Sequence, residues 1–187
     1  GNYAGTVVDC SGCSATVAAP VGCITFTTAT TNVTCFGGNN GSATLTVTGG
    51  APPRNITWVP SGSGPNISNL AAGTYTYNYS DALPSNSFSG TVVITEQAQI
   101  QLTAAITNVS CNGVADGAID ITVAGATFPC NFSWSNGANN EDPTNILAGT
   151  YVLVLQDANG CQARDSFLVS EPVQLSLSVV VTDVSCF

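Results

Sequence analysis

The chain has 187 residues and a formal net charge of −9, with two basic residues, eleven acidic residues and no histidine. This charge argues against nucleic-acid binding, because a protein that binds phosphates needs a basic surface. Lysine is absent as well, so general-base and nucleophile chemistry would have to rely on carboxylates. We therefore expect neither an enzyme nor a cofactor. No apolar run reaches the ~18 residues of a membrane-spanning helix.

The sequence repeats itself at a nearly fixed interval. The segment that opens at Cys35 returns 76 positions later at Cys111, and after the loss of one residue Glu96 and Glu171 match at 75. A fixed period of this kind indicates a tandem array of one structural unit. Such arrays usually serve as spacers, stalks or multivalent surfaces.

The phase of the repeat predicts four segments. We expect the C-terminal half of one repeat at 1–28, complete repeats at 29–104 and 105–179, and the opening strand of another repeat at 180–187. Because both ends fall inside a repeat, we expect a window from a longer polypeptide. The near-constant spacing leaves no room for variable linkers, which favours units stacked end to end as a semi-rigid rod.

Each unit shows the pattern of an all-β fold. Apolar and polar residues alternate, or aromatic and β-branched residues gather, in short segments separated by Gly-rich and Pro-rich turns. These segments are 42–48, 74–79, 118–123, 131–134 and 151–155. No stretch has a helical apolar period with caps. Short, evenly spaced strands of this kind predict an antiparallel β-sandwich.

Four aromatic residues recur at matching positions and are expected to organise the core. Trp58 and Trp134 lie in the middle of expected strands, where an indole would fill the space between two sheets. Tyr75 and Tyr151 each follow an Ala-Gly-Thr turn and enter a long strand. The functional alternative is stacking on sugars, but placement at the same position of each unit favours the core.

Asp9, Asp81 and Asp157 recur just before a hairpin. They could bind calcium, or cap nearby backbone N–H groups in an Asx-turn. The best further ligand candidates, Asp116 and Asp120, become Asn40 and Thr44 in the first complete unit, and a site integral to the repeat would not vanish in its neighbour. The turn is favoured, and no metal site is expected.

Eight cysteines in a chain rich in Gly and Thr favour disulfides, and therefore an oxidising, extracellular setting. Cys10 and Cys13 have the C-x-x-C spacing of zinc or redox sites. However, Ala158 stands at the Cys10 position of the second complete unit, and the chain has neither a second C-x-x-C nor a histidine. Disulfides are the favoured interpretation.

The pairing of the cysteines depends on how the chain returns after each hairpin. A bond from Cys111 to Cys161 would leave Cys35 without its natural partner. An antiparallel return along 173–181 would instead bring Cys186 beside Cys161, and each hairpin cysteine would then pair with the next opening cysteine. The pairs expected on this scheme are Cys13–Cys35, Cys161–Cys186, Cys10–Cys23 and Cys111–Cys130, the last of which is the least secure.

The second unit carries a set of motifs in a characteristic order. They are Val109-Ser-Cys111-Asn-Gly113, Phe132-Ser-Trp134, Leu147-Ala-Gly-Thr-Tyr151, Asp157-Ala-Asn-Gly-Cys161 and Ser170-Glu-Pro172. As a set they resemble the SprB repeat, a family that builds long surface adhesins in Bacteroidota, including the mobile filament of gliding cells. The first unit departs at its hairpin, which has no cysteine, and at Glu96-Gln97 in place of Glu-Pro.

This resemblance implies immunoglobulin-like (PKD-like) units, a type IX secretion route and a place on the cell surface. The function expected is that of a structural segment of a long extracellular adhesin or surface filament, with a role in gliding motility among its implications. A glycan-binding sandwich module is the alternative. The expected partners are neighbouring repeats of the same chain or filament and, for the alternative, surface glycans.

Overall fold

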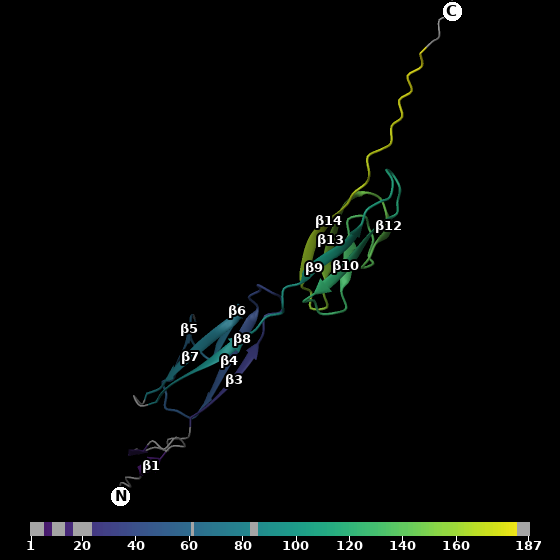
Figure 1. Cartoon of the computed structure of the whole chain (residues 1–187). Coiled ribbons are helices and arrows are strands. Elements are labelled where there is room, and N and C mark those ends of the chain that lie inside the picture. Colours follow the sequence, from purple (N-terminus) through teal and green to yellow (C-terminus); the bar gives the residue numbers. More distant parts are fainter. Residues whose placement is uncertain (1–5, 9–13, 17–23, 61, 83–85, 183–187) are drawn as a thin grey trace, which may run out of the picture. The chain divides into compact units, whose positions relative to one another are not determined.

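The computed structural model describes residues 6–8, 14–16, 24–60, 62–82 and 86–182 (Figure 1). Within these ranges the chain forms fourteen β-strands, and it has no helix long and apolar enough to span a membrane. The chain divides into two compact units, Gly1–Ala98 and Gln99–Phe187. We call these the first and the second unit and describe each by itself.

The first unit contains two three-stranded antiparallel sheets. One has the order β3 (Thr25–Thr31), β4 (Gly41–Thr48), β6 (Asn66–Leu70), and the other β5 (Asn55–Val59), β7 (Gly73–Ser80), β8 (Ser87–Ile94). A separate antiparallel pair joins β1 (Thr6–Val8) to β2 (Ser14–Thr16).

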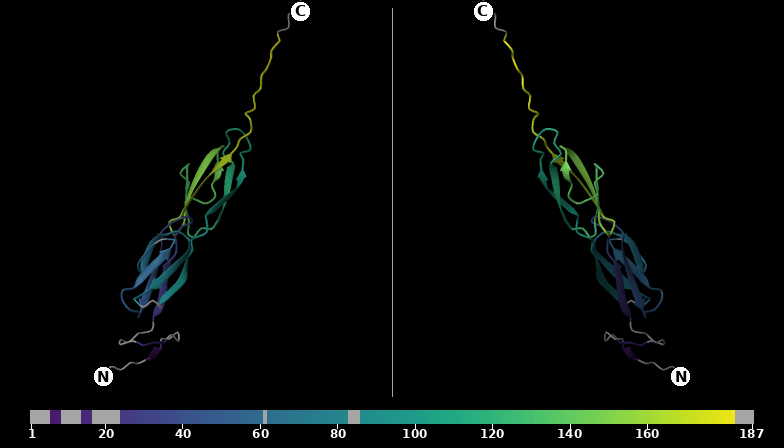
Figure 2. Two further views of the ribbon diagram at one scale, coloured as in Figure 1. Left: turned by 90° about the vertical axis from the view of Figure 1, so that its left-hand side faces the viewer. Right: turned by 90° about the vertical axis from the view of Figure 1, so that its right-hand side faces the viewer.

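The second unit repeats the two three-stranded sheets strand for strand, and Figure 2 shows them from two further sides. One sheet has the order β12 (Thr144–Ile146), β10 (Gly117–Ala124), β9 (Gln101–Thr107), and the other β11 (Asn131–Trp134), β13 (Gly149–Gln156), β14 (Gln162–Val169). The expected all-β class with antiparallel sheets is confirmed.

The division at 98/99 precedes the expected repeat boundary at 104/105. Strand β9 crosses that expected boundary and pairs along its whole length with β10, so it lies wholly in the second unit. The expected ranges 1–28, 29–104, 105–179 and 180–187 stay a prediction, because the outer two include residues outside the described part of the chain.

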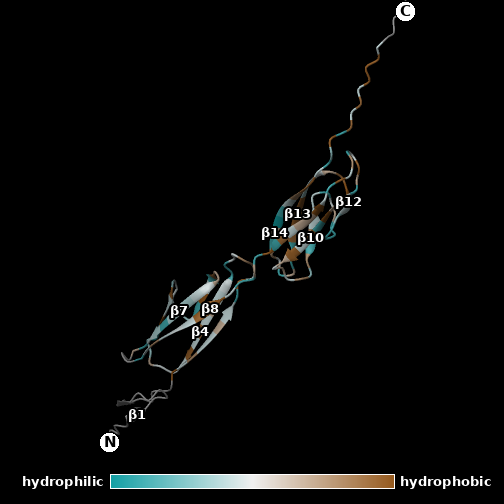
Figure 3. Cartoon of the chain, viewed as in Figure 1, coloured by the Kyte–Doolittle hydropathy of each residue, from teal (hydrophilic) through white to brown (hydrophobic). Residues whose placement is uncertain are grey.

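The core of each unit lies between its two sheets because side chains alternate across a strand. In β10 the first, third and fifth residues are buried, and in β13 every second residue from Tyr151 is buried. Apolar stretches accordingly run along β10 and β13 (Figure 3). In the first unit Leu45 of one sheet and Trp58 of the other belong to the same buried cluster.

Each unit has a leading end, where its first strand begins, and a trailing end, where its last strand stops. At the leading end of the second unit Gln101 pairs with Ala124, and the loop after β10 reaches the β13–β14 hairpin through Thr127 and Ala158. At the trailing end the Val109 N–H donates to the Ser170 carbonyl. The first unit closes likewise, where Val33 forms a parallel bridge with Glu96.

The return along 173–181, expected in order to pair Cys161 with Cys186, is not formed. Residues 170–182 contain no strand, and Val173, Leu175 and Leu177 are more than nine-tenths exposed. The reason lies in the repeat, because Leu177 stands where Leu102 stands in the first strand of the second unit. Such a strand pairs with a β10-type strand, and β10 already has β9 and β12 on its two edges.

Candidate functional site

The two tryptophans lie in the cores of their units. Trp58 and Trp134 are each 3% exposed, and each belongs to its unit's buried apolar cluster. The Trp58 Nε1–H donates to the Gly64 carbonyl at 3.0 Å, and that of Trp134 donates to the Asn140 carbonyl at 2.9 Å. Both indoles therefore meet their single polar requirement inside their own unit.

The two tyrosines pin a turn to the strand that follows it. The Tyr75 hydroxyl donates to the Ala71 carbonyl at 3.0 Å, and the Tyr151 hydroxyl to the Leu147 carbonyl at 2.9 Å. Both rings are buried, so none of the four recurring aromatics presents an open face for stacking on a sugar.

Asp157 holds the β13–β14 hairpin together. One carboxylate oxygen accepts the N–H groups of Asn159 and Cys161, each at 2.9 Å, and the other accepts the N–H of Thr127 at 3.1 Å. The side chain is 3% exposed. This is the expected Asx-turn, extended by a contact that ties the hairpin to the loop after β10.

Asp81 is the corresponding hydrogen-bond acceptor in the first unit, and its partners differ. Its Oδ2 accepts the Ala51 N–H at 3.0 Å, the Asn86 amide at 3.1 Å and the Tyr79 hydroxyl at 3.3 Å. Burial, and then the charge of Asp81, raise the pKa of Tyr79. Within the described ranges no three side chains of the types Cys, Asp and Glu gather in a way that could hold a metal ion.

A second recurring network lies at the trailing end of each unit. The Glu96 carboxylate accepts the Gly37 N–H at 2.6 Å, and the Glu171 carboxylate accepts the Gly113 N–H at 3.0 Å. The sequence places these glutamates at the joint between units but gives no hint of these partners. They fasten the exit of the chain to the loop that carries the opening cysteine.

The opening loop is shaped by one side chain that differs between the units. Asn40 accepts the Thr34 N–H at 2.9 Å, and Asp116 accepts the Ser110 N–H at the same distance. Hydrogen bonds from the Ser110 hydroxyl, and then from its N–H, lower the pKa of Asp116. The Asn-to-Asp exchange that argues against calcium therefore preserves an acceptor.

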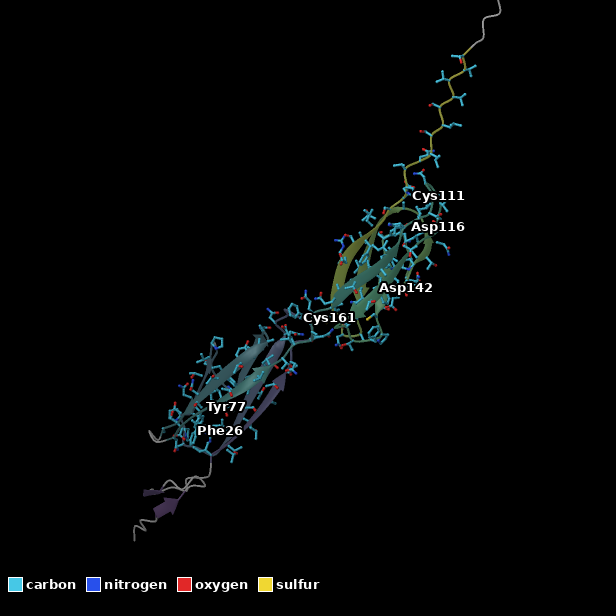
Figure 4. The ribbon with its side chains drawn as sticks, viewed as in Figure 1. Phe26, Tyr77, Cys111, Asp116, Asp142 and Cys161 are labelled. Atoms are coloured by element: carbon cyan, nitrogen blue, oxygen red, sulfur yellow. The ribbon has the colours of Figure 1, made fainter. Side chains whose placement is uncertain are left out.

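The described cysteines fall into two states. Cys35 and Cys161 are disulfide-bonded, whereas Cys111 and Cys130 are free. The expected Cys111–Cys130 bond is therefore wrong. Cys111 lies with Asp116 at the trailing end of the second unit (Figure 4), whereas Cys130 immediately precedes β11, whose first residue pairs with Gln156 at the leading end. The length of the sandwich separates the two thiols.

The other expected pairs are not decided by this distribution. Cys10, Cys13, Cys23 and Cys186 lie outside the described residues. Three expected pairs therefore stay predictions: Cys13–Cys35, Cys161–Cys186 and Cys10–Cys23. The antiparallel return that would bring Cys186 beside Cys161 is not formed by residues 173–181.

The first unit also has an aromatic cluster that the sequence analysis missed. The Phe26 ring centroid lies 5.2 Å from that of Tyr79, 5.3 Å from Phe88 and 6.3 Å from Tyr77 (Phe26 and Tyr77 are labelled in Figure 4). The corresponding residues of β9 and β13 are leucines. Phe88 stands opposite Tyr79 in the β7–β8 register, whereas Phe26 lies on β3 of the other sheet and meets these rings across the sandwich.

The fold and its recurring networks define a tandem array of antiparallel β-sandwich units. The family model described as the SprB repeat matches residues 27–63 and 103–139, once in each unit. The resemblance seen in the sequence is thereby confirmed. No curated protein matches the chain.

Several solved structures are similar to the chain. The three N-terminal domains of the highly immunogenic outer capsid protein of bacteriophage RB49 share 19% identity at a TM-score of 0.43, over 78% of this chain and 57% of that one. An I-band fragment from titin shares 16% at 0.44, over 78% and 64%. The mouse nectin-like molecule 4 ectodomain shares 13% at 0.39, over 81% and 66%. This chain thus spans less than two thirds of each.

Proposed function

We propose that the chain is a load-bearing segment of a long extracellular adhesin or surface filament, in which the repeats act as a stalk. That the chain is a structural repeat module rests on the two matches to the SprB repeat. The observation that carries the proposal is the fastening of each unit's opening segment to its closing segment, because that contact bears the load when the chain is pulled.

The fastening, which we call the clamp, has the same parts in both units. Val33 N–H donates to the Thr95 carbonyl at 2.9 Å, and Asn32 accepts the Thr95 N–H at 3.1 Å. In the second unit Val109 N–H donates to the Ser170 carbonyl at 3.2 Å, and Asn108 accepts the Ser170 N–H at 2.9 Å. The glutamate contacts to Gly37 and Gly113 complete the two clamps.

The geometry of the clamp suits it to tension along the chain. The opening segment runs from the leading to the trailing end, and the last strand runs the same way, so their bridge is parallel. Pulling the two ends of a unit apart therefore slides one segment along the other. The hydrogen bonds between them are then loaded together, and they do not open one after another.

The polar side chains that recur from unit to unit form hydrogen bonds within their own units. Asp157 and Glu171 both accept backbone N–H groups of their own unit, as do Asp81 and Glu96 in the first. This supports a structural role over catalysis, and repeat and sandwich families of this kind are typically non-enzymatic. Two oxidised cysteines support an oxidising, cell-surface location. Gliding motility and type IX secretion are proposed on the resemblance alone.

The glycan-binding alternative is not favoured. Its best candidates, the four recurring aromatics, are buried and hydrogen-bonded within their own units. The partners we propose are neighbouring repeats of the same long chain.

Single-molecule pulling of the chain under reducing conditions tests the proposal. We expect two unfolding events of similar size, each releasing on the order of 26 nm, because a unit of about 75 residues extends by roughly 3.5 Å per residue. A single event for both units, or unfolding without measurable resistance, would contradict it. Small-angle scattering tests the proposed rod, and units packed side by side would exclude an end-to-end stalk.

A further inference from the structure

Four asparagines of the chain are each followed by a glycine, and such a pair of residues can react with itself. The backbone nitrogen of the glycine attacks the side-chain Cγ of the asparagine and closes a five-membered ring. Glycine favours this reaction because it has no Cβ to hinder the approach. The four asparagines are Asn40, Asn112, Asn136 and Asn159. Their surroundings differ, and the structure therefore ranks them.

Asn136 lies in the exposed turn that follows β11. Its Oδ1 accepts the Ala138 N–H at 3.1 Å, which polarises the carbonyl under attack and stabilises the negative charge that develops on its oxygen. Within the described ranges the Nδ2 of Asn136, the atom that must leave, has no hydrogen-bond partner. A Cβ built on Gly137 meets nothing within 4 Å, so the attacking residue has open space in which to move.

Asn159 is the natural comparison, because it lies in the same kind of turn. The Gly160 N–H donates to the carbonyl three residues earlier at 3.0 Å, and the Gly137 N–H does the same at 2.9 Å. The two attacking nitrogens are therefore held alike. The leaving groups differ, because the Asn159 Nδ2 donates to the Thr127 hydroxyl at 3.0 Å. That hydrogen bond fixes the carboxamide of Asn159, and none fixes the leaving nitrogen of Asn136.

The other two pairs are restrained more strongly. The Asn40 Nδ2 donates to the Thr34 hydroxyl at 2.7 Å, and Gly41 is buried, with two atoms only 2.8 Å from the place of a Cβ. The N–H that follows Asn112 donates to the Glu171 carboxylate at 3.0 Å. A negative charge at that distance opposes the loss of the proton that the attack requires.

We propose that Asn136 is a site of spontaneous conversion to aspartate and isoaspartate. The Gly137 nitrogen gives up its proton and bonds to Cγ, the Cγ–Nδ2 bond breaks, and Nδ2 leaves as ammonia with that proton. Water then adds to either carbonyl of the ring and opens it. The reaction consumes one water and releases one ammonia, with no oxidant or enzyme.

The product changes the turn that holds a core strand. Isoaspartate places the former side-chain Cβ in the main chain, and so lengthens the turn in which the Trp134 N–H donates to the Ala138 carbonyl at 3.0 Å. The corresponding loop of the first unit, residues 59–65, contains no asparagine. This modification therefore belongs to the second unit.

Incubation of the whole chain at mildly alkaline pH tests the proposal, with pepsin digestion at low pH and tandem mass spectrometry as the readout. Asn136 should gain about 1 Da before the other three asparagines do. The chain unfolded in guanidinium should convert all four at similar rates, because the contacts that distinguish them are gone. The proposal is wrong if another Asn-Gly pair of the folded chain converts as fast as Asn136. It is equally wrong if Asn136 stays intact in the folded chain while the unfolded chain reacts.

Two variants separate the proposed causes. Asn136→Gln should remove the early gain in mass, because its longer side chain disfavours closure of the ring. Thr127→Val removes the hydroxyl that holds the Asn159 Nδ2 and keeps the backbone N–H that Asp157 accepts, so Asn159 should convert faster than in the parent chain. An unchanged rate at Asn159 would contradict the role given to the leaving group. An early gain in mass that persists in Asn136→Gln would place the modification elsewhere.

Discussion

A single position shows how the repeat tolerates change at the scale of one residue. Asn40 and Asp116 differ in charge, yet each offers an oxygen to the N–H at the start of the opening loop. What the position requires is an acceptor at a fixed place. The sequence could show that calcium binding is a poor explanation of Asp116, but the partner of the carboxylate came only from the structure.

The difference between Asn40 and Asp116 leads to a prediction about pH, in which the first unit serves as the control. Because the folded pKa of Asp116 lies below its ordinary value of 3.8, the carboxylate stays charged where an unfolded one is already protonated. Its hydrogen bonds therefore stabilise the loop above that value and are lost as the pH falls through the folded pKa. We expect the Ser110 amide proton to shift with a midpoint below pH 3.8 in an NMR titration.

The Thr34 amide of the first unit, which is held by neutral Asn40, should show no such step. A midpoint at or above the ordinary value would contradict the assignment of these hydrogen bonds.

The two free thiols should differ in reactivity. Cys111 is exposed, whereas Cys130 is partly buried, and its pKa is raised by burial and then by the charges of Asp157 and Glu141. A higher pKa leaves less thiolate at neutral pH, and the thiolate is the nucleophile. We expect maleimide to label Cys111 faster than Cys130, as followed by mass spectrometry. Equal rates would show that the Cys130 site is open to solvent.

At the scale of the element, the β13–β14 hairpin depends on one carboxylate. Asp157→Ala removes the acceptor of three backbone N–H groups, so we expect the second unit to lose about 2–4 kcal/mol of unfolding free energy. Urea unfolding monitored by Trp134 fluorescence in a Trp58→Phe background measures this loss. Asp120→Ala removes the same charge from an exposed position of β10 and should cost little. Similar losses in both variants would assign the effect to net charge.

The packing of each sandwich makes a prediction about independence. Trp134→Ala should destabilise the second unit by ~3–5 kcal/mol, because a buried indole is removed from its core. Hydrogen exchange should then show loss of protection in β10 and β13 and unchanged protection in β4 and β7. Trp58→Ala should instead remove protection in β4 and β7 and leave β10 and β13 unchanged. Loss of protection in both units from either substitution would show that they unfold as one.

The strands that could be predicted are those in which one face is buried. In β10 and β13 apolar residues recur at every second position of the sequence, because the buried face of each strand must be apolar. Strand β3 reads Thr-Phe-Thr-Thr-Ala-Thr-Thr and is exposed at all but one position, so it carries no such alternation. Its pairing with β4 defines it as a strand, and that pairing leaves no alternation within the residues of β3 itself.

The same limit explains the errors about the cysteines. Their recurrence predicts disulfides, but the pairs depend on which end of a unit each loop occupies. An antiparallel return along 173–181 would pair this segment with its own unit, whereas the structure shows that a segment of this type needs a free β10-type edge. The prediction of a Cys111–Cys130 bond is wrong because the direction of the strands places the two residues at opposite ends of the second unit. The repeat alone does not give that direction.

At the scale of the whole molecule, the clamp makes a prediction about force. Asn108→Ala removes the acceptor of the Ser170 N–H and hydroxyl, a loss of about 1–2 kcal/mol, in the second unit alone. In pulling experiments under reducing conditions one of the two unfolding events should move to lower force while the other is unchanged. Asn32→Ala should weaken the other event instead.

Asn136→Ala provides the matched control, because Asn136 lies in a turn outside the clamp. A fall in force as large as that of Asn108→Ala would mean that general stability, and not the clamp, sets the unfolding force.

The clamp also bears on how such a chain can be made. It joins residues about sixty positions apart, with separations of 63 and 59 in the first unit and 62 and 58 in the second. Contacts this distant cannot form until almost the whole unit has emerged from a ribosome or an export channel. A growing or translocating chain therefore completes its units one after another, in the order in which they emerge. At any moment the stretch still waiting to fold is shorter than a single unit, however long the polypeptide becomes.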